Sequence, residues 1–292
     1  MIGFWLVNLL PPGSPEEVEL KTPAGTWTLV RFHDFDKVVS HITNKGGCGT
    51  TYSAEFPLPT DSTRGQVMED AFAELLPICF SASFATGMAV TIRGHTMMSE
   101  VQVVARGKHF PRERGLNEGN PCVASLADFI KLVEAFVAKY PALDPIEKLR
   151  LLSHFFIDAM SCWSLENLYL SSSTLLQIIA STEEDTTRPF AQTYATSRRQ
   201  RKPAFFDYLA GAADRVGIPP LSHDVVKIRN SLIHEGTLSH ALLPTQADAS
   251  VPIAEAMNWF DSYIYAILGL GAVPVQRHKA SDYEHAINSF SY

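Results

Sequence analysis

The spacing of apolar residues changes near the middle of the chain, and this change restricts the possible folds more than any other sequence feature. Before residue 106 the apolar segments are short and largely strand-like, whereas after residue 122 they are long and repeat with helical spacing. The segment between them is polar and rich in glycine. We therefore predict an α+β protein, with a β-rich domain over residues 1–120 and an all-α helical bundle over residues 121–292.

The N-terminal half contains several short apolar or alternating segments bounded by turn residues. They predict strands over residues 2–10, 18–22, 26–32, 50–56, 88–92 and 100–105. Residues 64–76 have apolar side chains at helical spacing. We expect this helix to end within the charge-free stretch 75–92, where Pro77 and Gly87 also argue against a membrane span. Together these elements predict a compact β-sandwich or barrel-like domain that carries one helix.

Long segments with one apolar face predict the helices of the C-terminal half. They are expected over residues 125–140, 149–162, 163–182, 205–216, 224–235 and 253–270, and the second and third could form one continuous helix. Pro145 is predicted to begin a helix, because its missing donor costs nothing in a first turn. The polar tail from residue 276 shows no apolar face, and we expect it to be loosely held.

Charge and cysteine content limit the classes of function. The net charge is -7, with a pI of about 5.8, which argues against nonspecific coating of nucleic acid but leaves room for a local RNA cleft. The four cysteines form no closely spaced pair, so free thiols in a cytoplasmic protein are favoured over a zinc cluster. Residues 1–10 are apolar but lack a basic leader, and we interpret them as a strand rather than a signal peptide.

Three polar residues, Arg229, Asn230 and His234, interrupt an apolar helical pattern near the C-terminal end. Asn230 and His234 are four residues apart and therefore share one helix face, with Arg229 beside it. A guanidinium can bind two phosphate oxygens, and an imidazole transfers protons near neutral pH, so this group is suited to a phosphodiester. The alternative is a buried polar network that holds a bundle together. The apolar stripe of this helix is expected to comprise Val225, Ile228, Leu232 and Ile233.

The segment Arg229-Asn230-Ser231-Leu232-Ile233-His234 resembles the marker motif of the HEPN superfamily, and it looks most similar to the ApeA-type HEPN proteins of bacterial defence systems. The resemblance covers about residues 145–272. It implies a helical bundle and, in many members, a metal-independent ribonuclease that acts as a dimer. Other members only bind or pair. Carried onto this chain, the resemblance makes His234 the general acid/base, Arg229 the phosphate-binding cation and Asn230 the orienting amide.

This resemblance leads us to expect an endoribonuclease of phage defence or a stress response, with RNA as substrate and no metal or other cofactor. Arg229 and His234 diverge by roughly 140° around an ideal helix, so one copy is poorly placed to hold a phosphate from both sides. Two copies related by a twofold axis could do so, and we therefore expect a homodimer. Residues 1–120 would then sense a signal or restrain the nuclease. In the alternative, the bundle is a noncatalytic module for RNA binding or dimerisation.

Other polar residues could support this site. A run of four cations within five residues either follows an RNA backbone or forms a solvated loop. The run consists of Arg198, Arg199, Arg201 and Lys202. Glu166 could pair with Arg229 and orient it, or it could point to solvent. We interpret His154 and His223 as incidental, and the remaining histidines show no metal-binding spacing.

Overall fold

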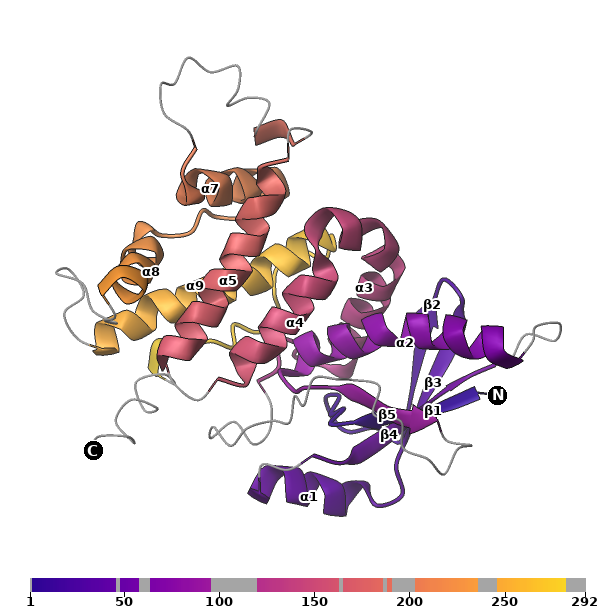
Figure 1. Ribbon diagram of the computed structural model, residues 1–292. Coiled ribbons are helices and arrows are strands. Elements are labelled where there is room, and N and C mark those ends of the chain that lie inside the picture. Colours follow the sequence, from indigo (N-terminus) through magenta and orange to yellow (C-terminus); the bar gives the residue numbers. More distant parts are fainter. Residues whose placement is uncertain are drawn as a thin grey trace. The chain divides into compact units, whose positions relative to one another are not determined.

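The computed structural model describes residues 2–45, 48–57, 64–95, 120–162, 165–185, 188–190, 203–235 and 246–281. The chain is α+β, as the sequence predicts, with a sheet in its N-terminal part and helices dominating the remainder (Figure 1). It divides into two compact units, Met1–Leu143 and Asp144–Tyr292. This division lies inside a helix, C-terminal to the glycine-rich segment at which the sequence pattern changes.

The first unit is built on a five-stranded antiparallel sheet with the order β2-β3-β4-β1-β5. Its strands are β1 (Ile2–Val7), β2 (Glu17–Thr22), β3 (Gly25–Arg31), β4 (Thr50–Phe56) and β5 (Thr91–His95). Phe4 of β1 and Leu29 of β3 both pair with Ala54 of β4, and all three side chains are buried. Because side chains alternate along a strand, this register gives the sheet one continuous apolar face.

Helix α2 (Arg64–Thr86) covers this apolar face. The Phe72 ring lies 6.5 Å from the Phe4 ring, measured between centroids, and the Trp27 indole N–H donates a hydrogen bond of 2.8 Å to Glu74. A second helix, α1 (Phe35–Lys45), packs its first residue against Tyr52 of β4. The charge-free stretch of the sequence is therefore core. None of the helices in the described ranges is long and apolar enough to cross a membrane.

The prediction of a sandwich or barrel with one helix was wrong. The described strands form a single sheet, because α2 supplies the apolar cover that a second sheet would otherwise give. Helix α1 was not predicted. Helix α2 continues ten residues past its predicted end, from residue 76 to Thr86, and passes through Pro77. Burial of Leu75 and Ile78 outweighs the hydrogen bond that the proline removes. The predicted strand 100–105 lies outside the described residues.

The second unit is a helical bundle. It contains the end of α3 (Leu126–Glu147), followed by α4 (Leu149–Met160), α5 (Leu165–Glu183), α7 (Phe205–Val216), α8 (His223–Glu235) and α9 (Gln246–Ile267). Helix α5 contacts α4, α7, α8 and α9, which places it at the centre of the bundle (Figure 1). Phe156 of α4 stacks on Phe260 of α9 with centroids 5.8 Å apart.

Three expectations for this half require correction. Pro145 lies inside α3 rather than at the start of a helix. Helices α4 and α5 are separate, since α4 ends at Met160 and α5 begins at Leu165. The tail is not loosely held at its beginning. Arg277 is buried, and its guanidinium donates to both carboxylate oxygens of Asp261 at 2.8 and 2.7 Å. An arginine can occupy a core only with such a partner, and the sequence does not reveal it.

Candidate functional site on helix α8

Helix α8 carries all three motif residues and is held by its neighbours at its first turns. The Ser222 hydroxyl accepts a hydrogen bond of 3.0 Å from the Asp224 N–H, and the Ser222 N–H donates to Glu255 of α9 at 2.7 Å. The hydroxyl of Tyr169 on α5 donates to the Val225 carbonyl. The predicted span 224–235 is thus confirmed, with one added residue at the N-terminal end.

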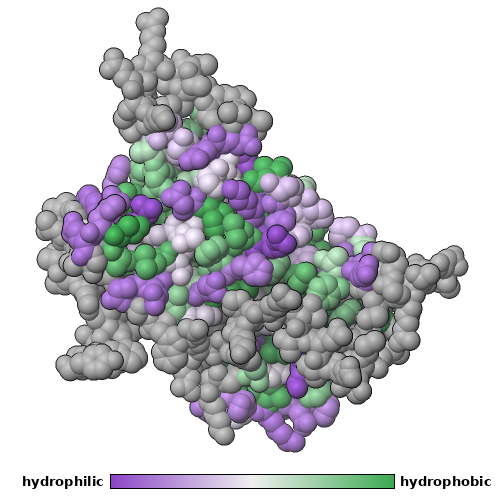
Figure 2. Space-filling model, in the orientation of Figure 1, coloured by the Kyte–Doolittle hydropathy of each residue, from purple (hydrophilic) through white to green (hydrophobic). Residues whose placement is uncertain are grey.

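The buried face of α8 is narrower than the sequence predicts. Val225 and Ile228 are buried, but Leu232 is half-buried and Ile233 is 46% exposed. Ile233 lies five residues after Ile228, so it points roughly 140° away around the helix. Apolar surface bordered by hydrophilic residues is visible where α8 lies (Figure 2). The expected stripe therefore contains one residue that faces solvent in the single chain.

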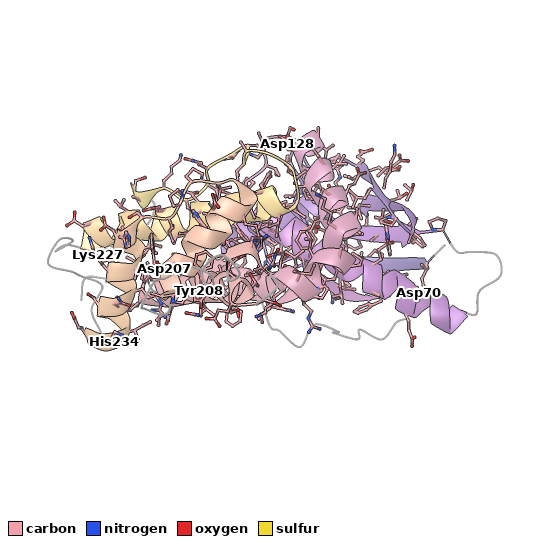
Figure 3. All side chains as sticks on the ribbon, turned by 90° about the horizontal axis from the view of Figure 1, so that it is seen from above. Asp70, Asp128, Asp207, Tyr208, Lys227 and His234 are labelled. Carbon is pink, nitrogen blue, oxygen red and sulfur yellow. The ribbon has the colours of Figure 1, made fainter. Side chains whose placement is uncertain are left out.

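Asn230 and His234 are both exposed on α8, one turn apart. Figure 3 shows His234 at the C-terminal end of the helix, on the same helix as Lys227. Measured around an ideal helix, His234 lies opposite the buried Val225. The two side chains are thus open to a ligand in a single copy of the chain.

Arg229 takes a different direction and is half-buried. Its guanidinium carbon lies 4.8 Å from the ring centroid of Phe205 on α7, in a cation–π contact. One terminal nitrogen donates a long bond of 3.4 Å to the Asn230 amide oxygen, while Nε has no hydrogen-bond partner among the described residues. The guanidinium is therefore held by an aromatic ring rather than by an ion pair among the described residues.

Among the other predicted site residues, Glu166 lies within the described part of the chain and does not pair with Arg229 there. Glu166 is half-buried in the first turn of α5, and the ion pairs found within the described ranges do not link it to Arg229. The basic run lies outside the described residues, and its residues are Arg198, Arg199, Arg201 and Lys202. Within the part of the chain that is described, His, Cys, Asp and Glu side chains form no group of three that could hold a metal ion.

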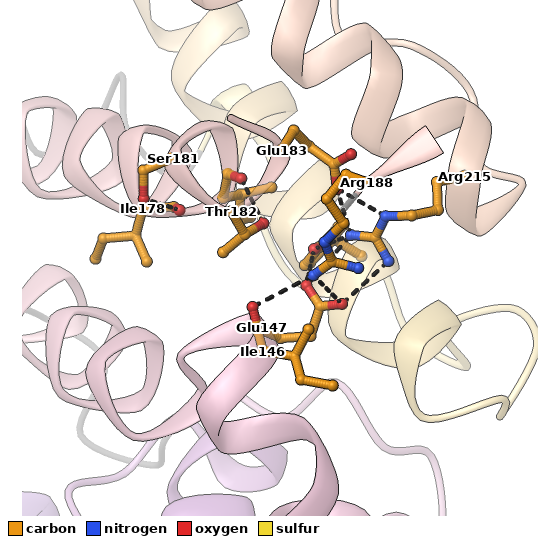
Figure 4. Close-up of polar contacts among 10 residues, drawn as sticks. Ile146, Glu147, Ile178, Ser181, Thr182, Glu183, Arg188 and Arg215 are labelled. Atoms are coloured by element: carbon orange, nitrogen blue, oxygen red, sulfur yellow. Dashed lines mark hydrogen bonds and ion pairs between the residues drawn. The ribbon is translucent and has the colours of Figure 1, made fainter. Parts of the chain in front are cut away.

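A second polar cluster lies in the bundle and was missed in the sequence. Glu147 at the end of α3 accepts hydrogen bonds from Arg188 at 2.9 Å and Arg215 at 3.0 Å (Figure 4). It also accepts one from the Tyr263 hydroxyl at 2.6 Å. Arg215 also donates to Glu183 at 2.7 Å. Burial alone would raise the pKa of Glu147, but the hydrogen bond from Tyr263 and the two guanidinium groups hold this pKa below its ordinary value.

This cluster ties helix ends together. Glu147 and Glu183 are the last residues of α3 and α5, and Arg215 lies in the last turn of α7. Glu147 is 3% exposed, so its carboxylate is enclosed by its partners rather than open to a substrate. The sequence signal was weak, because the four charged residues are separated by up to 68 positions and meet only in the folded bundle.

Searches with this chain against protein-family models, curated proteins and solved structures returned no match. The geometry of α8 and the motif that it carries are therefore the basis for assigning a function.

Proposed function

We propose that this protein is a metal-independent endoribonuclease of the HEPN type, active in phage defence or a stress response, with an active site composed of two copies of α8. The observation that carries the proposal is the exposure of Asn230 and His234 on one face of α8, with Arg229 directed to another side. Phosphodiester cleavage requires a proton-transfer group and a cation, here His234 and Arg229, but in one copy of the chain these two side chains point to different sides of α8. A second copy would complete the site.

The proposed reaction uses the 2′-hydroxyl of the RNA as its nucleophile. This oxygen attacks the adjacent phosphorus while an imidazole accepts its proton, and the bond from phosphorus to the 5′-oxygen breaks as that oxygen takes a proton from a second group. Two copies provide two His234 side chains for these two transfers. Arg229 would neutralise the charge that develops on the phosphate oxygens, and Asn230 would orient the phosphate.

The decisive experiment measures cleavage of a labelled RNA by the purified full-length chain in the presence of a metal chelator. His234→Ala is expected to reduce the rate by about 100-fold or more, because general acid–base groups contribute roughly that much. The matched control is His154→Ala, since His154 is exposed on α4, away from the motif helix. Cleavage by His234→Ala at the rate of the unmodified protein would refute the assignment, provided that both proteins melt at the same temperature.

A noncatalytic RNA-binding or dimerisation module is the second candidate. It is favoured by one observation, the packing of Arg229 on Phe205, because a half-buried cation on a ring is also a structural contact. This candidate predicts that Arg229→Ala lowers the stability of the bundle by about 1–3 kcal/mol. It also predicts that the unmodified chain cleaves no RNA with or without metal, whereas the ribonuclease requires cleavage that His234→Ala abolishes.

A further inference from the structure

Four polar side chains form a row along one face of α8. His223, Lys227, Asn230 and His234 follow one another at intervals of four, three and four residues. At 100° per residue they lie within roughly 60° of one another around the helix, and they span about 16 Å along its axis. His223, Asn230 and His234 are exposed, and the Lys227 side chain is 36% exposed. We name these four residues the α8 row.

The His234 end of the α8 row lies opposite the buried side of the helix. Val225, which is buried, is nine residues from His234 and therefore points about 180° away from it. The row holds one fixed cation, two imidazoles and an amide. Lys227 pairs with Asp224 at 2.8 Å, but both side chains are partly exposed, so this ion pair is weak and a phosphate can compete for the lysine.

One end of the row carries an aromatic stack. The ring of Phe206 on α7 lies 3.8 Å from the imidazole of His223, measured between centroids, with 24° between the two planes. His223 remains exposed although it is stacked on one side, so part of its ring is open to a third ring. The two neighbouring rings of α7 thus contact different residues of α8. Phe205 contacts Arg229, which is outside the row, whereas Phe206 stacks on His223, which belongs to it. The histidine that the sequence pattern left without a role is therefore placed in an aromatic contact.

We propose that the α8 row and Phe206 bind single-stranded RNA, with an unpaired base stacked on His223, a phosphate at Lys227 and the scissile phosphate near Asn230 and His234. The inference rests on the proposed function in one respect, namely that RNA is the ligand of the motif. Aromatic side chains stack on unpaired bases, whereas the bases of an A-form duplex are already stacked on one another. The length of the row corresponds to roughly five nucleotides at the 3.4 Å spacing of a stacked strand.

The test is a binding measurement that does not depend on cleavage. Fluorescence anisotropy of a labelled 2′-O-methyl RNA hexamer, which lacks the free 2′-hydroxyl, gives the Kd of the full-length protein, and a hairpin of the same chemistry serves as the duplex. Phe206→Leu and His223→Ala are each expected to weaken hexamer binding roughly five- to 150-fold, which corresponds to the usual range for loss of one stacked base. Lys227→Met is expected to reduce the slope of log K against log salt by about 0.7, the value for one phosphate of a single strand.

Two control variants are matched to these substitutions. Tyr208→Leu removes an aromatic ring two residues further along α7, on another side of that helix, and Lys131→Met removes an exposed lysine on α3. Both are expected to bind the hexamer like the unmodified protein. Because His223 is exposed, its substitution leaves the core of the bundle intact, and melting temperatures verify this for each variant.

Hexamer binding that is unchanged in both Phe206→Leu and His223→Ala would overturn the inference, as would equal affinity for the hairpin and the hexamer. These failures are distinct from failure of the ribonuclease assignment. If the chain cleaves RNA but Phe206→Leu, His223→Ala and Lys227→Met all bind the hexamer like the unmodified protein, the α8 row is not the RNA path, although the nuclease stands. If binding depends on the row while no RNA is cleaved, the row is established as a binding site and the nuclease is refuted.

Discussion

Replacement of Arg277 by methionine should destabilise the helical unit far more than its place in a polar tail would indicate. The side chains of Arg277 and Asp261 are 0% and 1% exposed, and two hydrogen bonds of 2.8 and 2.7 Å join them. Arg277 also lies over the Phe156 ring, 4.8 Å from its centroid. Arg277→Met would leave the carboxylate of Asp261 buried without its cation.

The expected loss is about 3–5 kcal/mol, the usual cost of breaking a buried ion pair by removing one partner. For a unit of this size, each kcal/mol lowers the melting temperature by about 2–4 °C, so the expected shift is roughly 6–20 °C. The double variant Asp261→Leu with Arg277→Met should recover much of this loss, because it leaves no unpaired charge in the core. Asp214→Asn, an exposed carboxylate on α7, is the control and should change the stability by no more than about 0.5 kcal/mol.

Urea denaturation followed by circular dichroism, together with thermal melts, measures these differences. The reasoning is refuted if Arg277→Met costs less than about 1 kcal/mol, the value of an exposed pair. It is also refuted if the double variant loses the sum of the two single effects, since that result would show that the two side chains do not interact.

Three further predictions concern the same unit. Glu147→Gln should lower the free energy of unfolding in urea by about 3 kcal/mol, because Arg188 and Arg215 lose their shared carboxylate. The control Glu166→Gln should leave this free energy almost unchanged. Equal losses in the two variants would contradict the role assigned to the cluster. Burial and the charge of Arg277 hold the pKa of His278 well below its ordinary value, so the unfolded chain binds a proton below about pH 6.5 that the folded chain does not. Stability should therefore fall as the pH decreases from 6.5 towards 5, by at most about 1.4 kcal/mol per pH unit, and a flat profile in thermal melts would exclude this linkage. Tyr169→Phe should destabilise the bundle by about 1 kcal/mol through loss of the bond to the Val225 carbonyl, and an unchanged urea midpoint would show that this bond does not hold α8.

Local patterns were sufficient for much of the secondary structure and for the α+β class. The strand 50–56 and the helix 205–216 agree with the structure at both ends, and the motif helix differs by one residue. These segments have clear periodicity and turn residues at their ends, so neighbouring residues alone specify them. The passage of α2 through Pro77 did not follow from such patterns, because burial of distant residues decides whether a helix survives a proline.

For the candidate site, too, some features follow from the sequence and others only from the folded structure. Spacing alone places Asn230 and His234 on one face of a helix, since that follows from helical geometry. Only the folded bundle determines that this face is exposed, that Arg229 packs on Phe205, and that His223 stacks on Phe206. The partner of Arg277 is likewise invisible in the sequence, because Asp261 lies sixteen residues away on another element. A helix face is a property of neighbouring residues, whereas burial, pairing and stacking are relations between segments that meet only when the chain folds.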